Sequence, residues 1–468
     1  MSSRTENAIF DADLVRRYDG PGPRYTSYPT AVQFHEGFGL VEYDTAARAS
    51  NDLDPKPLSL YFHVPFCESP CFYCGCNKII TRDHGRSRSY LEHLYLEIER
   101  QGRLYSRERL VDQLHFGGGT PTFLSDSELE ELFGVMKAHF TLRSDEDREY
   151  SIELDPRTVT GERLERLQKM GFNRFSLGVQ DFDPKVQEAV NRLQSEADTL
   201  DLIRHARAIG IDSISVDLIY GLPRQPVESF KTTLDKIITA RPDRIAAYSY
   251  AHLPHLFKAQ RQIKIADLLT PADKLGLLGL TVETLTGAGY VYIGMDHFAL
   301  PTDELVRAQV NGTLQRNFQG YSTRAECDLI ALGVSSISKV GDTYAQNAKT
   351  LPEYYRLIEA GGLAIRKGVA LSPDDRLRRD VIQSLMCATR LEFSAIEARY
   401  CIEFETYFSK ELSSLEALEK DGLVICADRA ISITPRGRLL MRNVAMLFDA
   451  HLAAGSSAGS QPRFSRVV

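Results

Sequence analysis

Short apolar runs alternate with amphipathic segments through the central part of the chain. Between the runs, apolar residues recur at helical spacing, as at Leu129, Leu132, Phe133 and Met136. The runs are rich in aliphatic, β-branched and aromatic residues and lie at 58–64, 113–116, 150–154, 174–179, 213–219 and 244–250. Strands that alternate with helices form parallel sheets with right-handed crossovers. The pattern therefore predicts an α/β fold, with six β/α units that make a partial (β/α)6 barrel.

The pattern changes on both sides of this barrel. Residues 1–50 form an N-terminal extension, in which three prolines and two glycines at 20–30 prevent helix and strand and leave a linker or a lid. We expect residues 51–365 to hold the barrel, with loop-like polar segments at 294–299, 317–323 and 332–338 that cover its mouth or merely connect elements. Residues 366–468 predict a small, mostly helical, winged-helix-like C-terminal domain.

Composition narrows the class of protein. The chain has 468 residues, 43% of them hydrophobic and 25% charged, with a net charge of −7, which is typical of globular proteins. No basic run suggests a nucleic-acid surface, and the C-terminal domain has no concentrated basic face, so we expect it to be structural rather than DNA-binding. No apolar run has the length of a signal peptide or a membrane span. These features predict a cytoplasmic protein without membrane or nucleic-acid partners, and a monomer.

Four of the eight cysteines, Cys67, Cys71, Cys74 and Cys76, lie within ten positions directly after the first apolar run. Thiolates are the soft ligands that iron–sulfur clusters and zinc both accept. Structural zinc sites normally combine two separated ligand pairs, and this sequence has no second Cys-x-x-Cys pair. Three thiolates spaced x3 and x2 can hold three irons of a [4Fe-4S] cube and leave the fourth iron open. The spacing favours such a cluster over zinc or a free-thiol loop.

The remaining cysteines occur in segments with periodic apolar patterns. They are Cys327, Cys387, Cys401 and Cys426. In a reducing compartment, scattered cysteines of this kind are buried thiols rather than disulfides or ligands. We expect all four to be buried and reduced.

Polar residues follow the predicted strands where a barrel gathers its chemistry, at the carboxyl ends. Three glycines at 117–119 end the second strand, Glu153 ends the third and Asp217 lies near the end of the fifth. Glycine lets a ligand approach the backbone closely, and the two carboxylates can bind hydroxyls or an ammonium group. Tyr73, between two of the cysteines, can stack on a planar base. These residues predict a ligand site beside the cysteine loop.

The cysteine spacing and the glycine-rich second loop resemble the radical S-adenosylmethionine (SAM) superfamily. Further motifs extend the resemblance over essentially the whole chain, to the family of oxygen-independent coproporphyrinogen III oxidases, at 22–30, 178–182, 217–223, 250–254, 294–298 and 464–468. The resemblance implies that Cys67, Cys71 and Cys74 bind a [4Fe-4S] cluster and that Cys76 does not. It also implies a radical-SAM barrel that converts two propionates of coproporphyrinogen III to vinyl groups in heme biosynthesis. A reduced low-potential carrier such as flavodoxin or ferredoxin would supply electrons.

The same resemblance implies two SAM molecules. By position in matching motifs, the first would contact Tyr61, Gly118, Glu153 and Ile337. The second would contact Tyr73, Gly119, Thr120, Gln180, Arg192, Asp217 and Ala251. Reductive cleavage of the first SAM would give the 5′-deoxyadenosyl radical, so the three cluster ligands, Tyr61 and Glu153 are the candidate catalytic residues.

A tetracarboxylate substrate needs cationic anchors, for which Arg24 and Arg316, with Gln319 nearby, are our hypotheses. Two other functions stay open. A heme-binding chaperone on the same scaffold would lack the N-terminal Arg24-Tyr25 segment and the cysteine at Cys76, both of which are present. An electron carrier would not account for the glycine loop or for the carboxylates at the strand ends.

Overall fold

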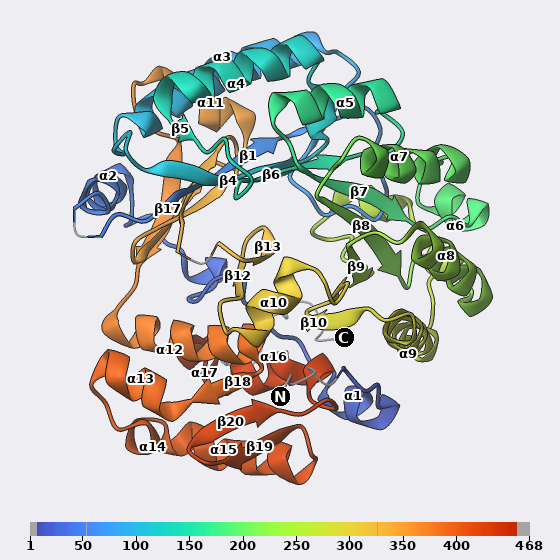
Figure 1. The fold of residues 1–468 in the computed structure, drawn as a ribbon, viewed down its shortest axis with the longest axis vertical. Coiled ribbons are helices and arrows are strands. Elements are labelled where there is room, and N and C mark those ends of the chain that lie inside the picture. The colour runs from blue at the N-terminus through green and yellow to red at the C-terminus, as the bar shows by residue number, and fades with distance from the viewer. Residues whose placement is uncertain (1–6, 53, 325, 456–468) are drawn as a thin grey trace.

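The computed structural model describes residues 7–52, 54–324 and 326–455, so the motif at 464–468 lies outside the described residues. Six neighbouring parallel strands form an arc at its centre (Figure 1). In sheet order they are β9 (Arg244–Ser249), β8 (Ser213–Tyr220), β7 (Arg174–Gln180), β6 (Glu149–Leu154), β4 (Leu110–Gly118) and β1 (Leu58–Val64). Each coincides with one of the predicted runs to within a few residues, so the partial (β/α)6 barrel is confirmed.

Helices in the connections cover the outer face of the arc (Figure 1). They are α3 (Gly85–Gly102), α4 (Asp126–His139), α5 (Gly161–Met170), α6 (Pro184–Ala189), α7 (Glu196–Ala208) and α8 (Val227–Ala240), and α9 (Pro271–Gly287) follows β9. The local sequence determines where two of these helices begin or end. The Ser125 side chain accepts from the Glu128 amide and starts α4, and Gly171, with φ of 117°, ends α5 in the left-handed region.

The sheet continues beyond the six units at both edges. On the β1 side, β14 (Asp328–Leu332) pairs in parallel with β1 and is followed by β15 (Ile337–Val340), β16 (Thr343–Asn347) and β17 (Ile365–Ala370). On the β9 side lie β11 (His297–Ala299) and β10 (Val291–Gly294). Of the segments expected to be loops, 294–299 is largely strand, whereas 332–338 is mostly the turn that joins β14 to β15. The strands at these two edges are short and lack a clear alternation of polar and apolar residues, which hides them in the sequence.

The expected boundary between residues 365 and 366 falls inside β17, whose residues belong to the large sheet. Beyond it, β18 (Arg390–Glu392), β20 (Ala430–Ile433) and β19 (Val424–Ala427) form a small sheet. The surrounding helices are α12 (Pro373–Gln383), continued by a π-helical turn (Ser384–Ala388), α13 (Phe393–Tyr400), α14 (Phe404–Tyr407), α15 (Ser409–Lys420), α16 (Met441–Met446) and α17 (Ala450–Gly455). The predicted order of helix, hairpin and helix is present in α15, β19, β20 and α16.

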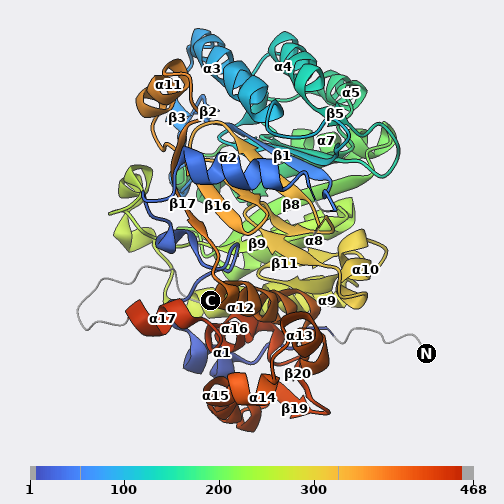
Figure 2. The same cartoon turned by 90° about the vertical axis from the view of Figure 1, so that its left-hand side faces the viewer.

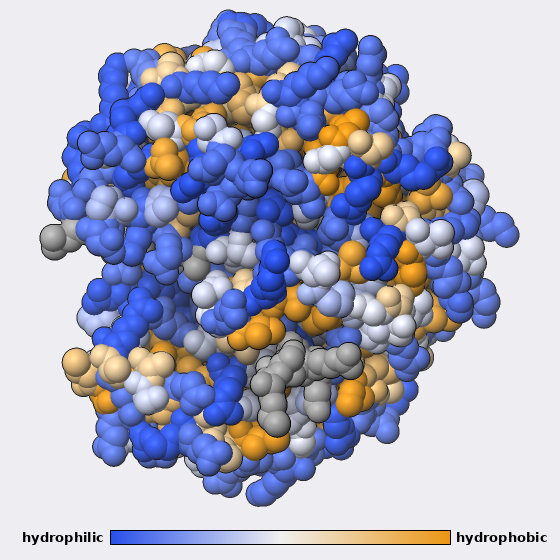
Figure 3. All heavy atoms as spheres, in the orientation of Figure 1, coloured by the Kyte–Doolittle hydropathy of each residue, from blue (hydrophilic) through white to orange (hydrophobic). Residues whose placement is uncertain are grey.

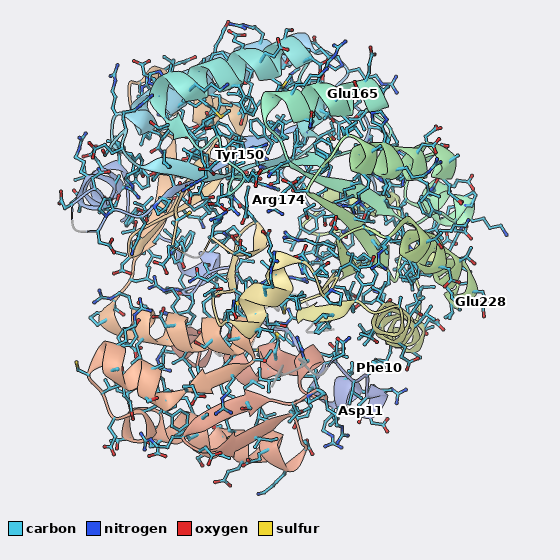
Figure 4. The ribbon with its side chains drawn as sticks, viewed as in Figure 1. Phe10, Asp11, Tyr150, Glu165, Arg174 and Glu228 are labelled. Carbon is cyan, nitrogen blue, oxygen red and sulfur yellow. The ribbon has the colours of Figure 1, made fainter. Side chains whose placement is uncertain are left out.

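The N-terminal extension holds α1 (Ala12–Tyr18), which lies beside the C-terminal part, and α2 (Leu40–Ala49), which packs against β15 and β16 of the large sheet (Figure 2). Tyr25 and Tyr28 are each only 1% exposed, and the Tyr25 hydroxyl donates to Asp449 Oδ2 at 3.0 Å. Figure 4 labels Phe10 beside α1, and its ring contacts Gly279 of α9. The extension is therefore a packed element and not a free linker.

The two faces of the arc differ in polarity. In β1, Leu58, Leu60, Phe62 and Val64 are buried on one face, while Ser59, Tyr61 and His63 alternate with them. Figure 4 shows Arg174 inside the arc, where its Nη2 donates to Glu304 of α10 (Glu304–Val310) at 3.0 Å. Glu165 and Glu228 lie on the outer helices in the same view. The interior of the barrel is thus polar, as a site for a charged ligand requires.

Two further observations bear on the sequence predictions. None of the helices in the described residues combines the length and the low charge needed to cross a bilayer.

Cys327 and Cys387 are buried as expected, but Cys401 and Cys426 are exposed, so the prediction was wrong for these two. Cys401 adopts the left-handed conformation directly after α13, and Cys426 lies on the edge strand β19, where a periodic apolar pattern does not ensure burial.

Candidate active site

The register of the parallel strands brings the predicted residues to one end of the barrel. Val64 pairs with Gly118, Glu153 with Ser176 and Gly178 with Asp217. These residues come from five neighbouring strands, and all but Ser176 lie in the carboxyl-terminal halves of their strands. The register thus brings the predicted residues together at the end of the strands where barrels gather their chemistry.

Two histidines that the sequence analysis missed line the same face. Tyr61 stacks on His115 with ring centroids 5.8 Å apart and an interplanar angle of 13°. The Tyr61 hydroxyl lies 3.1 Å from Nδ1 of His63. Alternate residues of a strand share a face, so the spacing of two residues from Tyr61 to His63 was the signal that could have revealed His63.

The glycine loop is hydrogen-bonded to the start of the cysteine loop. The Gly119 amide donates to Val64 O at 2.8 Å, and the Thr120 amide donates to Phe66 O at 2.8 Å. The Thr120 hydroxyl donates to Cys67 Sγ at 3.4 Å. A Cβ at Gly119 would lie only 2.7 Å from Phe66 O, so this contact requires glycine. The two motifs therefore form one unit, although the sequence separates them by about fifty residues.

Cys71 lies against two arginines. Its Sγ accepts from Arg192 Nη1 at 3.4 Å and from Arg157 Nη2 at 3.6 Å. Both guanidinium groups also pair with Asp155, at 3.2 Å from Arg192 and 2.6 Å from Arg157. Arg157 had not been predicted as a site residue, and the two arginines hold a positive potential beside this thiol.

The other two thiols have distinct environments. Burial, with the negative charges of Cys74 and Cys71 adding to it, raises the pKa of Cys67 to about 11. The pKa of Cys74 is lowered to about 5 by a hydrogen bond with the Cys76 side chain and by the charge of Lys78, against the effect of burial. The Cys76 amide also donates to Cys74 Sγ at 3.4 Å.

These features fit a [4Fe-4S] cluster better than a single metal ion. Within the part of the chain that the structure describes, no three His, Cys, Asp or Glu side chains converge as the ligands of one ion do. The thiolates of a cubane bind different irons, so they surround the cluster and need not meet at one point. Arg157, Arg192 and Lys78 offset the negative charge that thiolate ligands bring, and the amide of Cys76 hydrogen-bonds a ligand sulfur. Hydrogen bonds of this kind tune cluster potentials.

The two strand-end carboxylates differ in protonation. Glu153 Oε1 lies 3.3 Å from His115 Nε2, and Glu153 Oε2 accepts from the Gly118 amide at 3.2 Å. Burial opposes ionisation of Glu153, but His115 and this amide outweigh it and lower the pKa. Burial and the nearby charge of Glu153 raise the pKa of Asp217 to about 7. The site therefore holds one stable carboxylate and one that titrates near neutral pH.

The raised pKa of Asp217 predicts a stability effect that grows with pH. Between its ordinary pKa of 3.8 and about 7, Asp217 ionises in the unfolded chain but stays protonated in the native one, so rising pH lowers the free energy of unfolding. Asp217→Asn removes this loss of stability, because asparagine does not ionise. We expect its Tm to exceed that of the wild type by several degrees at pH 8, and by much less at pH 5. Asp198→Asn, a change at an exposed aspartate, should show no such trend, and parallel Tm profiles for Asp217→Asn and wild type would contradict the assignment.

The remaining residues predicted to contact SAM lie in three places. Gln180 ends β7 with φ of 66°, next to Gly178. Tyr73 packs against an apolar cluster that includes Val190 and Tyr250, and its carbonyl accepts from Gln260 Nε2 at 2.9 Å. The same Gln260 donates to Ala251 O at 3.1 Å, so Tyr73 and Ala251 are joined. Ile337, at the start of β15, packs beside Phe34, Tyr344 and Leu371 in a different cluster.

The proposed substrate anchors meet between the extension and the β12–β13 hairpin (Gln315–Asn317 and Gly320–Ser322). Arg316 Nε donates to Arg24 O at 3.2 Å, and the Arg316 guanidinium lies 4.9 Å over the Tyr321 ring. Arg24 is ion-paired with Asp296. In contrast, Arg316 Nη1 and Gln319 Nε2 are buried without a hydrogen-bond partner among the described residues. Arg316 is therefore the better placed of the two arginines to receive an external carboxylate.

A cavity of about 910 Å³ lies between the barrel and the C-terminal part, where Figure 3 shows a hydrophilic hollow. Its wall includes Ser59 and Gln113, which lie in the amino-terminal halves of β1 and β4, away from the cysteine loop. Arg316 and Arg379 also line it. The cluster ligands, the glycine loop and Glu153 are not among its lining residues, and of the proposed site residues Arg316 lines it.

Comparison with known proteins matches both parts of the chain. A model of the radical SAM superfamily matches residues 61–237, and a model of the HemN C-terminal domain matches residues 371–440. The second match begins directly after β17. Together the two matches cover the barrel units β1 to β8 and most of the small C-terminal part.

Full-length relatives carry the same resemblance. The oxygen-independent coproporphyrinogen III oxidase of Pseudomonas aeruginosa is 51% identical over 459 residues, covering 98% of this chain and 99% of that protein. The corresponding protein of Escherichia coli is 47% identical, with 98% of each chain covered. The solved structure of the Escherichia coli coproporphyrinogen III oxidase, titled as a radical SAM enzyme, aligns with a TM-score of 0.90 at 46% identity, covering 95% of this chain and 100% of that one. The chain therefore belongs to the family of oxygen-independent coproporphyrinogen III oxidases, within the radical SAM superfamily.

Proposed function

We propose that the protein catalyses the oxygen-independent oxidative decarboxylation of two propionate side chains of coproporphyrinogen III. The product is protoporphyrinogen IX, an intermediate of heme biosynthesis. The observation that carries the proposal is the 51% identity to a named oxidase over 98% of the chain. The hydrogen-bonded unit of cysteine loop and glycine loop at the carboxyl end of the barrel supports it.

A [4Fe-4S] cluster and SAM, when bound, supply the 5′-deoxyadenosyl radical that removes hydrogen from a propionate. The chain's own residues hold and shield these groups. Cys67, Cys71 and Cys74 are the proposed cluster ligands. Glu153, ionised and held by the Gly118 amide, presents a carboxylate to the ammonium or the hydroxyls of a first SAM. We assign to the packed extension the exclusion of water from the barrel mouth that radical chemistry requires.

We further propose that two SAM molecules bind. Tyr61, Gly118, Glu153 and Ile337 are the candidate contacts of the first. The candidate contacts of the second are Tyr73, Gly119, Thr120, Gln180, Arg192, Asp217 and Ala251. The contacts of Gln260 with both Tyr73 and Ala251 support grouping these two residues at one site. The protein would act as a cytoplasmic monomer that receives electrons from a reduced low-potential carrier such as flavodoxin or ferredoxin.

The buried, unpartnered Nη1 of Arg316 leads to a prediction about substrate affinity. A hydrogen bond between charged groups contributes about 1.5–3 kcal/mol, so Arg316→Gln should raise the KM for coproporphyrinogen III by about 10- to 100-fold. Iron content and SAM cleavage without substrate should stay close to wild type. Arg307→Ala, at an exposed arginine on α10, is the control. An unchanged KM in Arg316→Gln would remove Arg316 from the substrate site.

Anaerobic reconstitution with iron and sulfide, followed by product analysis, tests the proposed function. With SAM, reductant and coproporphyrinogen III, we expect protoporphyrinogen IX, CO₂, 5′-deoxyadenosine and methionine. Bound heme without decarboxylation would indicate a heme chaperone instead. A cluster that cycles between redox states without SAM cleavage would indicate an electron carrier. Either of the last two results would refute the proposed function.

A further inference from the structure

A positively charged segment packs against the cysteine loop. Between Asp243 and Asp267 the chain has no acidic residue, although its net charge is −7. The segment forms two short 3₁₀ helices, η3 (Lys258–Gln262) and η4 (Ile265–Asp267). Figure 2 shows it in yellow-green at the left-hand edge of the molecule. It is thus a cationic surface on an otherwise acidic protein.

The charges of this segment face solvent. Lys258, Arg261 and Lys264 are all exposed. Asp267, the next acidic residue along the chain, is already paired with Arg224 at 2.9 Å. Within the described residues, no carboxylate lies within ion-pair distance of Lys258, Arg261 or Lys264. The three charges are therefore available to an acidic partner.

Exposed apolar side chains lie among these charges. Leu256 is 62% exposed and Ile265 is 80% exposed. Apolar residues surrounded by polar and cationic ones are typical of transient protein interfaces. We call Leu256, Lys258, Arg261, Lys264 and Ile265 the basic patch.

One layer of side chains separates the basic patch from the proposed cluster ligands. The Phe257 ring lies 3.0 Å from where a Cβ on Gly75 would stand, and Gly75 directly follows Cys74. Gln260, in the middle of η3, donates to the carbonyl of Tyr73, which directly precedes Cys74. Ile263 packs in the same cluster as Tyr73. A protein bound on the basic patch would therefore lie next to the cysteine loop.

We propose that the basic patch is the docking site for a small acidic electron-carrier protein that reduces the cluster. The inference rests on the proposed function. One electron passes from the reduced carrier to the oxidised cluster, so the carrier is oxidised by one electron and the cluster is reduced by one. Opposite charges steer the encounter, and the small apolar contact gives the short-lived complex that turnover requires.

Charge reversal separates docking from chemistry. The variant Lys258→Glu/Arg261→Glu/Lys264→Glu is assayed for protoporphyrinogen IX formation with purified reduced flavodoxin, and separately with dithionite. With flavodoxin at low salt we expect the rate to fall at least about 10-fold, while the rate with dithionite stays within about twofold of wild type. Salt should slow the flavodoxin-driven wild type, because charges are screened beyond about 8 Å at 0.15 M, and should leave the variant nearly unaffected.

A matched control carries the same change of charge elsewhere. Lys137→Glu/Lys410→Glu/Lys420→Glu alters three exposed lysines on α4 and α15 and should keep the flavodoxin-driven rate. Equal losses in the two triple variants, or no loss in the basic-patch variant, would overturn the proposal. An equal loss with dithionite would also overturn it, because the segment would then be holding the cysteine loop. If the wild type formed no product with dithionite, the proposed function would fail instead, and calorimetric titration with oxidised flavodoxin would still test docking.

Discussion

Replacing any one of Cys67, Cys71 or Cys74 by serine is expected to abolish the cluster and, with it, product formation. A serine hydroxyl is a harder ligand than a thiolate and is far less acidic than a thiol. The cluster would therefore lose one of its three protein ligands. Changes to residues that only support metal ligands already cost about 10- to 100-fold, so loss of a ligand should reduce turnover by more than 100-fold. Iron content, the visible absorption of the reconstituted protein and 5′-deoxyadenosine formation are the measurements.

Two cysteine controls make this test specific. Cys76→Ser keeps the backbone amide that donates to Cys74 Sγ, so it should retain its iron and change turnover only modestly. Cys426→Ser, on the exposed edge strand β19, should behave as wild type. If iron content fell equally in Cys76→Ser and in the three ligand variants, the assignment of an open iron, and the radical mechanism built on it, would have to be abandoned.

The barrel could be predicted from the sequence because its signals are local. Each of the six strands is an uninterrupted apolar run or a clear alternation, and α4 and α5 carry their own capping residues, Ser125 and Gly171. The position of the site followed from a general property of parallel sheets, the convergence of carboxyl ends, and did not require a three-dimensional model. Glu153, Asp217 and the glycine loop were found in this way, whereas Tyr61 was implied by the resemblance to the family.

The features that the sequence did not reveal depend on contacts between segments that are far apart in the chain. The ion pair of Arg24 with Asp296 joins residues 272 positions apart, and no local pattern reports it. The same holds for Asp155, whose position between Arg157 and Arg192 gives Cys71 its positive surroundings. The strands β14 to β17 were missed because tertiary pairing, and not their own periodicity, makes them strands.

Burial of residues 20–30 changes how the lid hypothesis has to be tested. Residues 20–30 were expected to form a linker or a lid, and Tyr25 and Tyr28 of this segment are almost fully buried. Deleting residues 1–30 would therefore remove part of the core as well as any lid. A single change such as Tyr25→Phe, which removes only the hydrogen bond to Asp449, is the cleaner way to ask whether this segment couples SAM cleavage to decarboxylation.

Gly119→Ala is expected to disable the site through the backbone alone. The new Cβ would lie 2.7 Å from Phe66 O, 2.9 Å from Pro65 C and 3.0 Å from Phe66 N, and none of these main-chain atoms can rotate away. Overpacking in a tight site costs about 1–3 kcal/mol, and here the strain falls on the residue preceding Cys67. We expect a lower Tm, weaker retention of iron and at least about a 10-fold loss of turnover.

Gly134→Ala provides the matched control, since a Cβ at this exposed position of α4 would meet nothing within 4 Å. Alanine is favoured over glycine inside a helix by about 0.5–1 kcal/mol, so this variant should be slightly more stable than the wild type and equally active. The same added methyl group would then have opposite effects at the two positions. Wild-type turnover and iron content in Gly119→Ala would mean that the glycine and cysteine loops can separate without loss, and that their close contact does not hold Cys67 in place.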